Sequence, residues 1–235
     1  GGGGFGAVYR AEQSLVGRVV AVKVIHERVQ HDDELRLRFL REARSVAGLK
    51  SPHIVTLFDY GEESDGLLYM VFEFVPGQTL KDVLMAERRL PISTAAQYSI
   101  QILEGLSVAH QEGIVHRDLK PANIIIASGA WGVEQARVLD FGVAKMLDSG
   151  GREGEEASTR RGLVLGTPHY MSPEQARTRA IDPRADLYAM GTLLFAMVAG
   201  RPPFLGDSTF DILQKQVQEP IDGPLETLDV SQDFK

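Results

Sequence analysis

The stretch from His116 to Asn123 carries the side chains of this sequence that are best suited to chemistry. A carboxylate (Asp118), an ammonium group (Lys120) and a carboxamide (Asn123) follow one another closely. Pro121 cannot continue a regular helix, so the stretch is predicted to be a loop on which the three side chains turn toward one point. Such a trio suits a reaction in which a hydroxyl loses a proton while negative charge and a divalent metal ion are held nearby.

A second lysine lies in a strand-like segment. Residues 19 to 25 form an apolar, β-branched run interrupted only by Lys23, which is typical of a buried strand with one functional side chain. Because side chains alternate along a strand, Ala21 shares a face with Lys23 and leaves room for a flat ring beside the ammonium group. The alternative is a lysine at a strand edge whose stem lies on apolar surface.

A second carboxylate, Asp140, directly follows the strand predicted over residues 137 to 139 and precedes Gly142 by two positions. A carboxylate at the end of a buried strand can reach a cation. Oxygen ligands from Asp140 and Asn123 suit Mg²⁺ or Mn²⁺ rather than zinc.

Glycines open the chain: Gly1, Gly3 and Gly6 precede Val8. Glycine allows the backbone to approach phosphates closely. By themselves these residues also fit a flexible linker or a dinucleotide-binding loop. Residues 7 to 11 favour a strand, whereas a dinucleotide fold requires a helix at once, so a dinucleotide-binding loop is disfavoured.

A helix is predicted over residues 33 to 49, where Leu35, Phe39 and Val46 fall on one stripe. Glu42 falls on the same stripe, at a position where a carboxylate is costly without a partner. Lys23 is the predicted partner. A local pair with an arginine of the same helix, such as Arg38, is the alternative.

Further elements follow from periodicity and turn residues. Strands are predicted over residues 54–58, 67–74, 124–126 and 137–139, and helices over 80–88, 92–112, 185–199 and 210–218. The apolar residues predicted to face the core are Ile102, Leu103, Leu106 and Ala109 on the long second helix, and Phe210, Leu213 and Val217 on the last one.

Composition narrows the class of protein. The 235 residues are 43% hydrophobic, carry a net charge of −7 and contain no cysteine. The acidic balance argues against a protein that binds nucleic-acid backbones, and the lack of cysteine excludes disulfides and thiolate chemistry. No apolar run reaches the roughly 20 residues that span a bilayer, so no membrane contact is expected of this segment. The glycine-rich start and polar end suggest a fragment of a longer protein.

Taken together, the motifs resemble those of protein kinases. His116 to Asn123 resembles H-R-D-x-K-P-x-N, the glycines G-x-G-x-x-G-x-V, Val20 to Lys23 the V-A-I-K strand, and Asp140-Phe141-Gly142 the D-F-G motif. Residues 166 to 174 resemble G-T-x-x-Y-x-[AS]-P-E, and their wording around Met171 looks like that of bacterial receptor-like Ser/Thr kinases.

The resemblance implies an α+β, two-lobed kinase fold. Its expected parts are a β-rich N-lobe (residues 1–72), a hinge (73–79) and a mainly helical C-lobe (80–235) that lacks its last helices. A cytoplasmic location is implied, either as a free protein or as the intracellular domain of a membrane-anchored one.

The resemblance also implies a role for each candidate residue. The implied catalytic residues are Asp118 as base, Lys120 as neutraliser of γ-phosphate charge, Lys23 and Glu42. ATP would contact Gly1, Gly3, Gly6, Val8, Ala21, Lys23, the gatekeeper Phe72, the backbone of Glu73 and Val75, and Ile125. Asn123 and Asp140 would hold Mg²⁺ or Mn²⁺, and the supporting residues would be His116, Phe141, Thr167, Glu174 and Asp186.

Residues 147 to 162 are polar and glycine-rich and contain Ser158 and Thr159. In kinases with an arginine before the catalytic aspartate, here Arg117, a phosphate on this loop pairs with that arginine. Thr159, with Ser158 as second choice, is therefore a predicted autophosphorylation site, and self-association would serve transfer between copies. An unmodified solvated loop is the alternative.

The sequence thus predicts an ATP- and Mg²⁺-dependent kinase that acts on Ser/Thr hydroxyls of proteins. Two alternatives stand beside it: a pseudokinase-like, ATP-binding regulatory module, and a small-molecule phosphotransferase of related fold. The first would typically lack Lys23, Asp118 or Asp140, and the second lacks an expected counterpart of residues 166 to 174.

Overall fold

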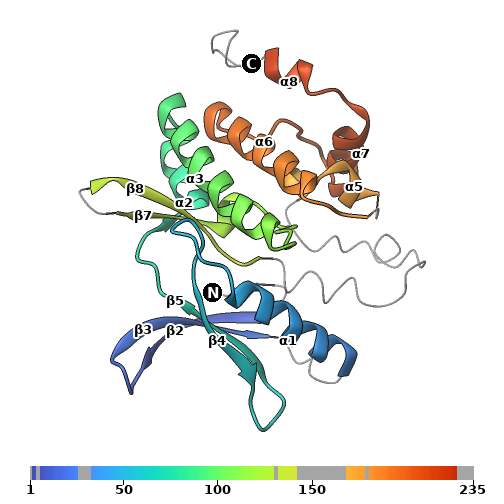
Figure 1. Ribbon diagram of the computed structural model, residues 1–235. Helices are drawn as coiled ribbons and strands as arrows, with labels where there is room; N and C mark the ends of the chain where they lie inside the picture. Colours follow the sequence, from blue (N-terminus) through green and yellow to red (C-terminus); the bar gives the residue numbers. More distant parts are fainter. Residues whose placement is uncertain are drawn as a thin grey trace.

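The β-branched first part of the chain folds into an antiparallel sheet (Figure 1). The computed structural model describes residues 2–3, 6–25, 33–129, 132–141, 168–177 and 180–226. The five strands of the sheet, in spatial order, are β1 (Gly2–Gly3), β2 (Gly6–Gln13), β3 (Arg18–Ile25), β5 (Leu68–Glu73) and β4 (Leu57–Glu62).

The register of this sheet decides which residues share a face. Val8 lies opposite Lys23, and Ala21 lies opposite Phe72. Directly opposed residues point to the same side of a sheet, and so do residues two apart on one strand. Val8, Ala21, Lys23 and Phe72 therefore lie on one face, as the resemblance requires of a nucleotide site.

Helix α1 (Asp33–Ala47) packs on the sheet through Phe39, Ala43 and Val46, all buried. Arg36 fixes it to β4 through an ion pair with Glu62, whose oxygen lies 2.6 Å from the guanidinium nitrogen. The predicted stripe of apolar residues is thus confirmed for Phe39 and Val46, and Leu35 is half-buried against the core.

The strand predicted from Ile54 is wrong in its first half, since β4 begins at Leu57. The backbone around Ile54 instead pairs with β8 (Glu134–Val138): Val55 N–H donates to the carbonyl of Val138 at 2.9 Å, and Val138 N–H donates to the carbonyl of His53 at 2.9 Å. The residues around Ile54 therefore do pair with a strand, but their partner is β8 of the small sheet and not the large sheet.

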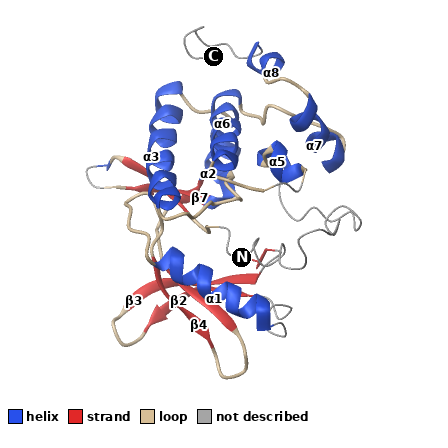
Figure 2. Ribbon diagram, turned by 45° about the vertical axis from the view of Figure 1, so that its right-hand side comes forward, coloured by secondary structure: helices blue, strands red, loops and turns tan. Residues whose placement is uncertain are grey.

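The second part of the chain is mainly helical, as Figures 1 and 2 show. Its helices are α2 (Leu80–Glu87), α3 (Ile92–Gln111), α5 (Pro173–Ala176), α6 (Arg184–Ala199), α7 (Thr209–Gln218) and α8 (Asp222–Glu226). A small sheet of β6 (Gln78–Thr79), β7 (Ile124–Ser128) and β8 lies between these helices and the large sheet. Short 3₁₀ turns cover Pro121–Asn123 and Pro168–Tyr170. The expected α+β class is confirmed.

Helix α6 lies at the centre of this part and is buried almost all round, including Ala189, Leu193 and Met197. It packs against α3 and against the 3₁₀ turn at Pro168–Tyr170. None of the helices in the described ranges combines the length and apolar composition needed to cross a bilayer.

Two predicted core residues lie on the surface. On α3, Ile102, Leu106 and Ala109 are buried as predicted, but Leu103 is 38% exposed because it lies beside that stripe rather than on it. On α7, Phe210 is 75% exposed, and Ile212 and Gln216 face inward instead.

Leu106 and Leu103 make a matched pair for a stability test. We expect Leu106→Ala to lower the free energy of unfolding by about 2–5 kcal/mol, because it leaves a cavity in the core. Leu103→Ala should cost less than about 1 kcal/mol, since its side chain is partly in water. Urea unfolding followed by circular dichroism measures both, and equal losses would contradict the assignment of the α3 core stripe.

Candidate active site

The loop between α3 and β7 gathers its three polar side chains at one point. The Lys120 ammonium lies 2.8 Å from Oδ2 of Asp118. The Asn123 amide donates to the carbonyl of Asp118 at 2.8 Å and to its Oδ2 at 3.2 Å. Pro121 is buried and begins the 3₁₀ turn that brings Asn123 back toward Asp118. The convergence expected from the sequence is therefore present in the loop.

His116 is fully buried and joins this loop to the end of β8. Its Nδ1 accepts the backbone N–H of Asp118 at 3.2 Å, which leaves Nε2 as the donor to the carbonyl of Leu139 at 2.8 Å. Its ring also packs against Phe141, with 4.9 Å between centroids. The neutral imidazole thus has both nitrogens engaged, in keeping with a supporting role and not with proton transfer.

Asp186 of α6 holds the same loop through its backbone N–H groups. Its carboxylate is 1% exposed and accepts the backbone N–H groups of His116 at 2.8 Å and of Arg117 at 2.9 Å. Arg117 has φ of +64°, a left-handed conformation that is unfavourable for a residue with a side chain. The Arg117 Nε is buried and has no hydrogen-bond partner among the described residues.

Lys23 and Asp140 lie in contact across the site. The ammonium nitrogen lies 2.7 Å from Oδ2 of Asp140, and the lysine side chain is only 13% exposed. Asp140 also has a left-handed backbone, with φ of +53°, which turns its carboxylate from the end of β8 toward the sheet. The pair links β3 of the large sheet to the segment that follows β8 of the small sheet.

The predicted Lys23–Glu42 pair is not found within the described residues, where Asp140 takes the lysine instead. Glu42 is half-buried on α1, so water can solvate its carboxylate without a cationic partner. The alternative Arg38 pairs with Glu34 at 2.7 Å rather than with Glu42. A catalytic role of Glu42 stays a prediction.

Most of the residues expected around ATP lie on one face of the large sheet or in the segment that follows it, and Ile125 lies in β7. Phe72 and Val75 are buried, Ala21 and Ile125 are half-buried, and Val8 is 43% exposed. At Gly6 a Cβ atom would lie 1.9 Å from the carbonyl oxygen of Val24, so only glycine fits at this first residue of β2. Gly3 lies in β1.

The two predicted metal ligands come from adjoining backbone. Leu139 N–H donates to the carbonyl of Asn123 at 2.8 Å, which brings Asn123 next to the residue that precedes Asp140. Within the described ranges there is no cluster of three or more His, Cys, Asp or Glu residues that would hold a metal alone. One carboxylate and one amide fit Mg²⁺, which keeps several waters and usually takes its remaining ligands from phosphates.

Several predicted residues lie outside the described residues: Gly1, Gly142, Ser158, Thr159 and Thr167. Glu174 is described and opens α5. Burial, with the charge of Glu174, raises the pKa of the Tyr188 hydroxyl to about 12.

Sequence reasoning missed Arg137 of β8, which binds the predicted hinge residue Glu73 through two bonds of 2.7 and 2.6 Å. Arg137 also donates to the carbonyl of Ile54 at 3.0 Å. Its guanidinium holds the pKa of the Glu73 carboxyl below the usual range. The sequence carries little signal for this residue, because β8 also contains Glu134 and Gln135 and a further charged residue does not stand out there.

Comparison with known proteins gives concordant results. A family model described as protein kinase domain matches residues 1–233. The chain is 40% identical to serine/threonine-protein kinase pkn3 of Myxococcus xanthus over 93% of its length, and 41% identical to serine/threonine-protein kinase PrkC of Bacillus subtilis over 93%. It spans 40% and 32% of those two proteins.

Among solved structures, the fold is similar to that of Rad53 residues 1–466 in complex with AMP-PNP. The TM-score is 0.76 and the sequence identity 28%, over 99% of this chain and 55% of that one.

The Glu73–Arg137 pair should make stability depend on pH. Because the pKa of Glu73 is lowered in the folded state, its contribution is complete above the unfolded value of about 4.3 and is lost as pH falls through the folded value. We expect wild type to be more stable than Glu73→Gln near pH 7 and this difference to shrink below about pH 4.3. Urea unfolding at each pH measures it. Arg137→Gln should abolish the same dependence, and a difference that does not change with pH would contradict the pair.

Proposed function

Because the chain belongs to the protein kinase domain family, we propose that it transfers the γ-phosphate of ATP to Ser or Thr hydroxyls of proteins. One observation carries the proposal: a carboxylate, Asp118, is held by a lysine and an amide on one loop, while a lysine and a second carboxylate meet across the same site. These are the groups that phosphoryl transfer requires for positioning and charge stabilisation.

In the proposed reaction the acceptor hydroxyl donates a hydrogen bond to Asp118 and attacks the γ-phosphorus. The new O–P bond forms as the bond to the β–γ bridging oxygen breaks, and ADP leaves. The hydroxyl proton passes to Asp118 and then to water. Lys120, already 2.8 Å from Asp118, supplies positive charge beside the transferring group.

Lys23 is the proposed partner of the α- and β-phosphates. Its ammonium is mostly shielded from water, so its attraction to phosphate oxygens is less weakened by solvent than that of a surface lysine. The Asp140 carboxylate neutralises this charge in the structure, and binding of ATP would exchange that carboxylate for phosphate.

Asn123 and Asp140 are the residues that we propose to hold Mg²⁺. When bound, such an ion neutralises charge on the β- and γ-phosphates. Asp140 is oriented for this by its left-handed backbone, and Asn123 by the hydrogen bond from its amide to Asp118.

The protein substrate and the choice of Ser/Thr over Tyr are inferred from relatives and from motif residues. The relatives bear the name serine/threonine-protein kinase, and Lys120 together with residues 166 to 174 favours the same acceptors. A pseudokinase-like module is the second candidate, but Lys23, Asp118, Asn123 and Asp140 are all present.

Activation by phosphorylation of Thr159 or Ser158 is the remaining part of the proposal. Arg117 supports it, because its buried Nε has no hydrogen-bond partner in the described part of the chain and an anion beside it would supply one. We propose with it that one copy of the protein transfers phosphate to another. The proposed location is cytoplasmic, either as a free protein or as the intracellular domain of a membrane-anchored one.

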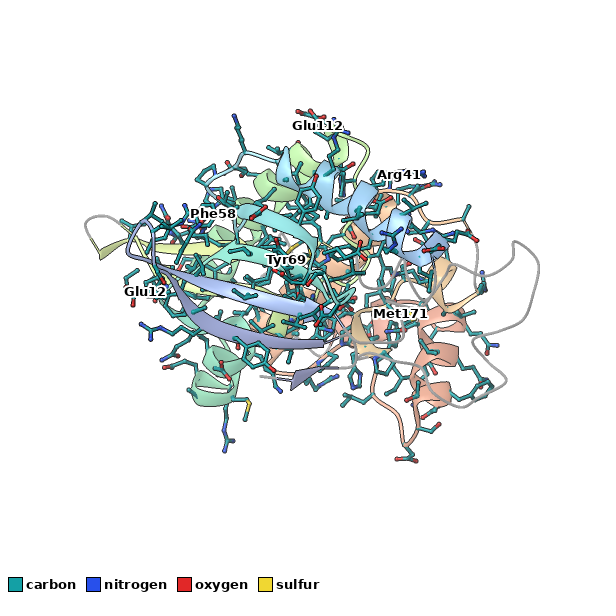
Figure 3. All side chains as sticks on the ribbon, turned by 90° about the horizontal axis from the view of Figure 1, so that it is seen from below. Glu12, Arg41, Phe58, Tyr69, Glu112 and Met171 are labelled. Atoms are coloured by element: carbon teal, nitrogen blue, oxygen red, sulfur yellow. The ribbon has the colours of Figure 1, made fainter. Side chains whose placement is uncertain are left out.

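The central test is Asp118→Asn. The amide keeps the shape of the side chain but cannot take up a proton, so we expect transfer from labelled ATP to a Ser/Thr protein substrate to fall by about 10²- to 10⁴-fold. Binding of ATP should be retained. Glu112→Gln, at the exposed end of α3 (Figure 3), is the control and should transfer at the wild-type rate. Unchanged transfer by Asp118→Asn would sink the mechanism.

A second test concerns activation. Mass spectrometry of active protein should find phosphate on Thr159 or Ser158, and treatment with a phosphatase should slow transfer. Arg117→Gln should slow it to a similar extent, and the two effects should not add, because phosphate and guanidinium act through one contact. Full activity of the dephosphorylated protein would argue for the unmodified loop.

A further inference from the structure

The segment Pro168–Ser172 precedes α5 and is held at several points. Gln216 of α7 donates to the carbonyl of Pro168 at 2.9 Å, and the ring of His169 lies 3.2 Å from the carbonyl oxygen of Phe204. Ser172 is completely buried and caps α5. Met171 lies on the side of the molecule opposite the β7–β8 hairpin (Figure 3).

One side chain joins this segment to the catalytic loop. Gln175 of α5 accepts the backbone N–H of Ser172 through Oε1 at 3.0 Å. Its Nε2 donates to the carbonyl of Arg117 at 2.8 Å. The first bond belongs to a helix cap, but the second reaches a residue far away in the sequence, so the amide does more than cap α5.

The carbonyl that Gln175 holds belongs to the strained residue that precedes Asp118. Arg117 is kept at φ of +64° with its N–H on Asp186 and its C=O on Gln175. A backbone conformation that costs about 1–2 kcal/mol persists only where its surroundings enforce it. Asp186 and Gln175 therefore hold the peptide groups on either side of Arg117. These two contacts set the direction in which the backbone continues into Asp118.

Glutamine is the residue type that this bridge requires. One end must accept from an N–H group and the other must donate to a carbonyl, about one side chain apart. Glutamate accepts at both ends, lysine and arginine only donate, and methionine is apolar. Asparagine carries the right groups on a shorter side chain.

The position of the bridge points to the acceptor substrate. Lys23 belongs to the large sheet, where ATP is proposed to bind, and its ammonium contacts Asp140. In-line transfer brings the acceptor from the other side of the γ-phosphate. Of the described chain, the segment Pro168–Ser172 and α5 belong to the helical part and not to the large sheet, and α5 lies between α6 and α7 in Figure 2.

We propose that Gln175 is a positioning residue that sets the segment Pro168–Ser172 in register with Asp118, so that a protein chain lying on this segment presents its Ser or Thr hydroxyl to the carboxylate. The inference rests on the proposed function. It assigns to one amide the coupling between the site of the acceptor protein and the catalytic loop, with no part in ATP binding.

The test is Gln175→Glu, which keeps the acceptor for Ser172 and removes the donor to Arg117. We expect kcat/KM for a Ser/Thr peptide to fall by about tenfold or more, because a buried carbonyl loses its partner and faces a carboxylate. The dissociation constant for ATP, measured by calorimetry, should not change. Gln175→Met, which removes both bonds without adding charge, should lower kcat/KM for peptide as well.

Gln101→Glu is the matched control. Gln101 of α3 also accepts a backbone N–H, from Ala136 at 2.6 Å, and donates to a backbone carbonyl, that of Glu134 at 3.3 Å, but it lies beside β8. It should lose stability in thermal melts as Gln175→Glu does and keep the wild-type kcat/KM for peptide.

Three results would overturn the inference: an unchanged kcat/KM for peptide in both Gln175 variants, an equal fall in Gln101→Glu, or an ATP affinity that falls in parallel with peptide turnover. Failure of the proposed function looks different, because wild-type protein would then transfer no phosphate while the Gln175 variants behave as it does.

Discussion

The geometry of the site depends on one buried negative charge, the carboxylate of Asp186. Most of helix α6 is apolar and Asp186 is buried, so this charge is costly unless several donors meet it. The donors are the backbone N–H groups of His116 and Arg117 and the ring of His110, which lies 2.8 Å from Oδ2. Because the two N–H groups belong to the catalytic loop, the need to satisfy the carboxylate fixes that loop on the core.

A series of hydrogen bonds and ion pairs connects the loop that Asp186 holds to the rest of the site. The His116 ring accepts the N–H of Asp118 on one side and donates to the carbonyl of Leu139 on the other, so Asp118 and the segment that leads from β8 to Asp140 share one support. Asn123 adds a second link between the same two segments. Arg137 and Glu73 extend the connection from β8 to the end of the large sheet. Every link is a hydrogen bond or ion pair formed by a partly or wholly buried group, where water competes least.

The sequence predicted most of this fold because local signals and tertiary structure agree. The β-branched run around Lys23 and the apolar periodicity of α3 and α6 occur where the structure has a strand and two helices. Prediction failed where the partner of a group comes from a distant part of the chain. Ile54 pairs with β8, and Lys23 forms its ion pair with Asp140 and not with Glu42. Gln175 binds Arg117. The spacing of residues along one element predicts none of these contacts. Phe210 was misplaced for a smaller reason, a shift of two residues around α7.

The left-handed backbones of Arg117 and Asp140 carry a consequence for how the protein can change. Of the non-glycine residues in the described ranges, three have positive φ, and two of them directly adjoin or carry the proposed chemistry. Glycine would relieve the backbone cost of a positive φ at both positions, but at Asp140 it would also leave Lys23 without its partner. It would also remove the guanidinium and the carboxylate that the site uses. The protein therefore keeps an unfavourable backbone conformation at these two positions for the side chains that the site needs. A substitution that eased the backbone there would lower activity.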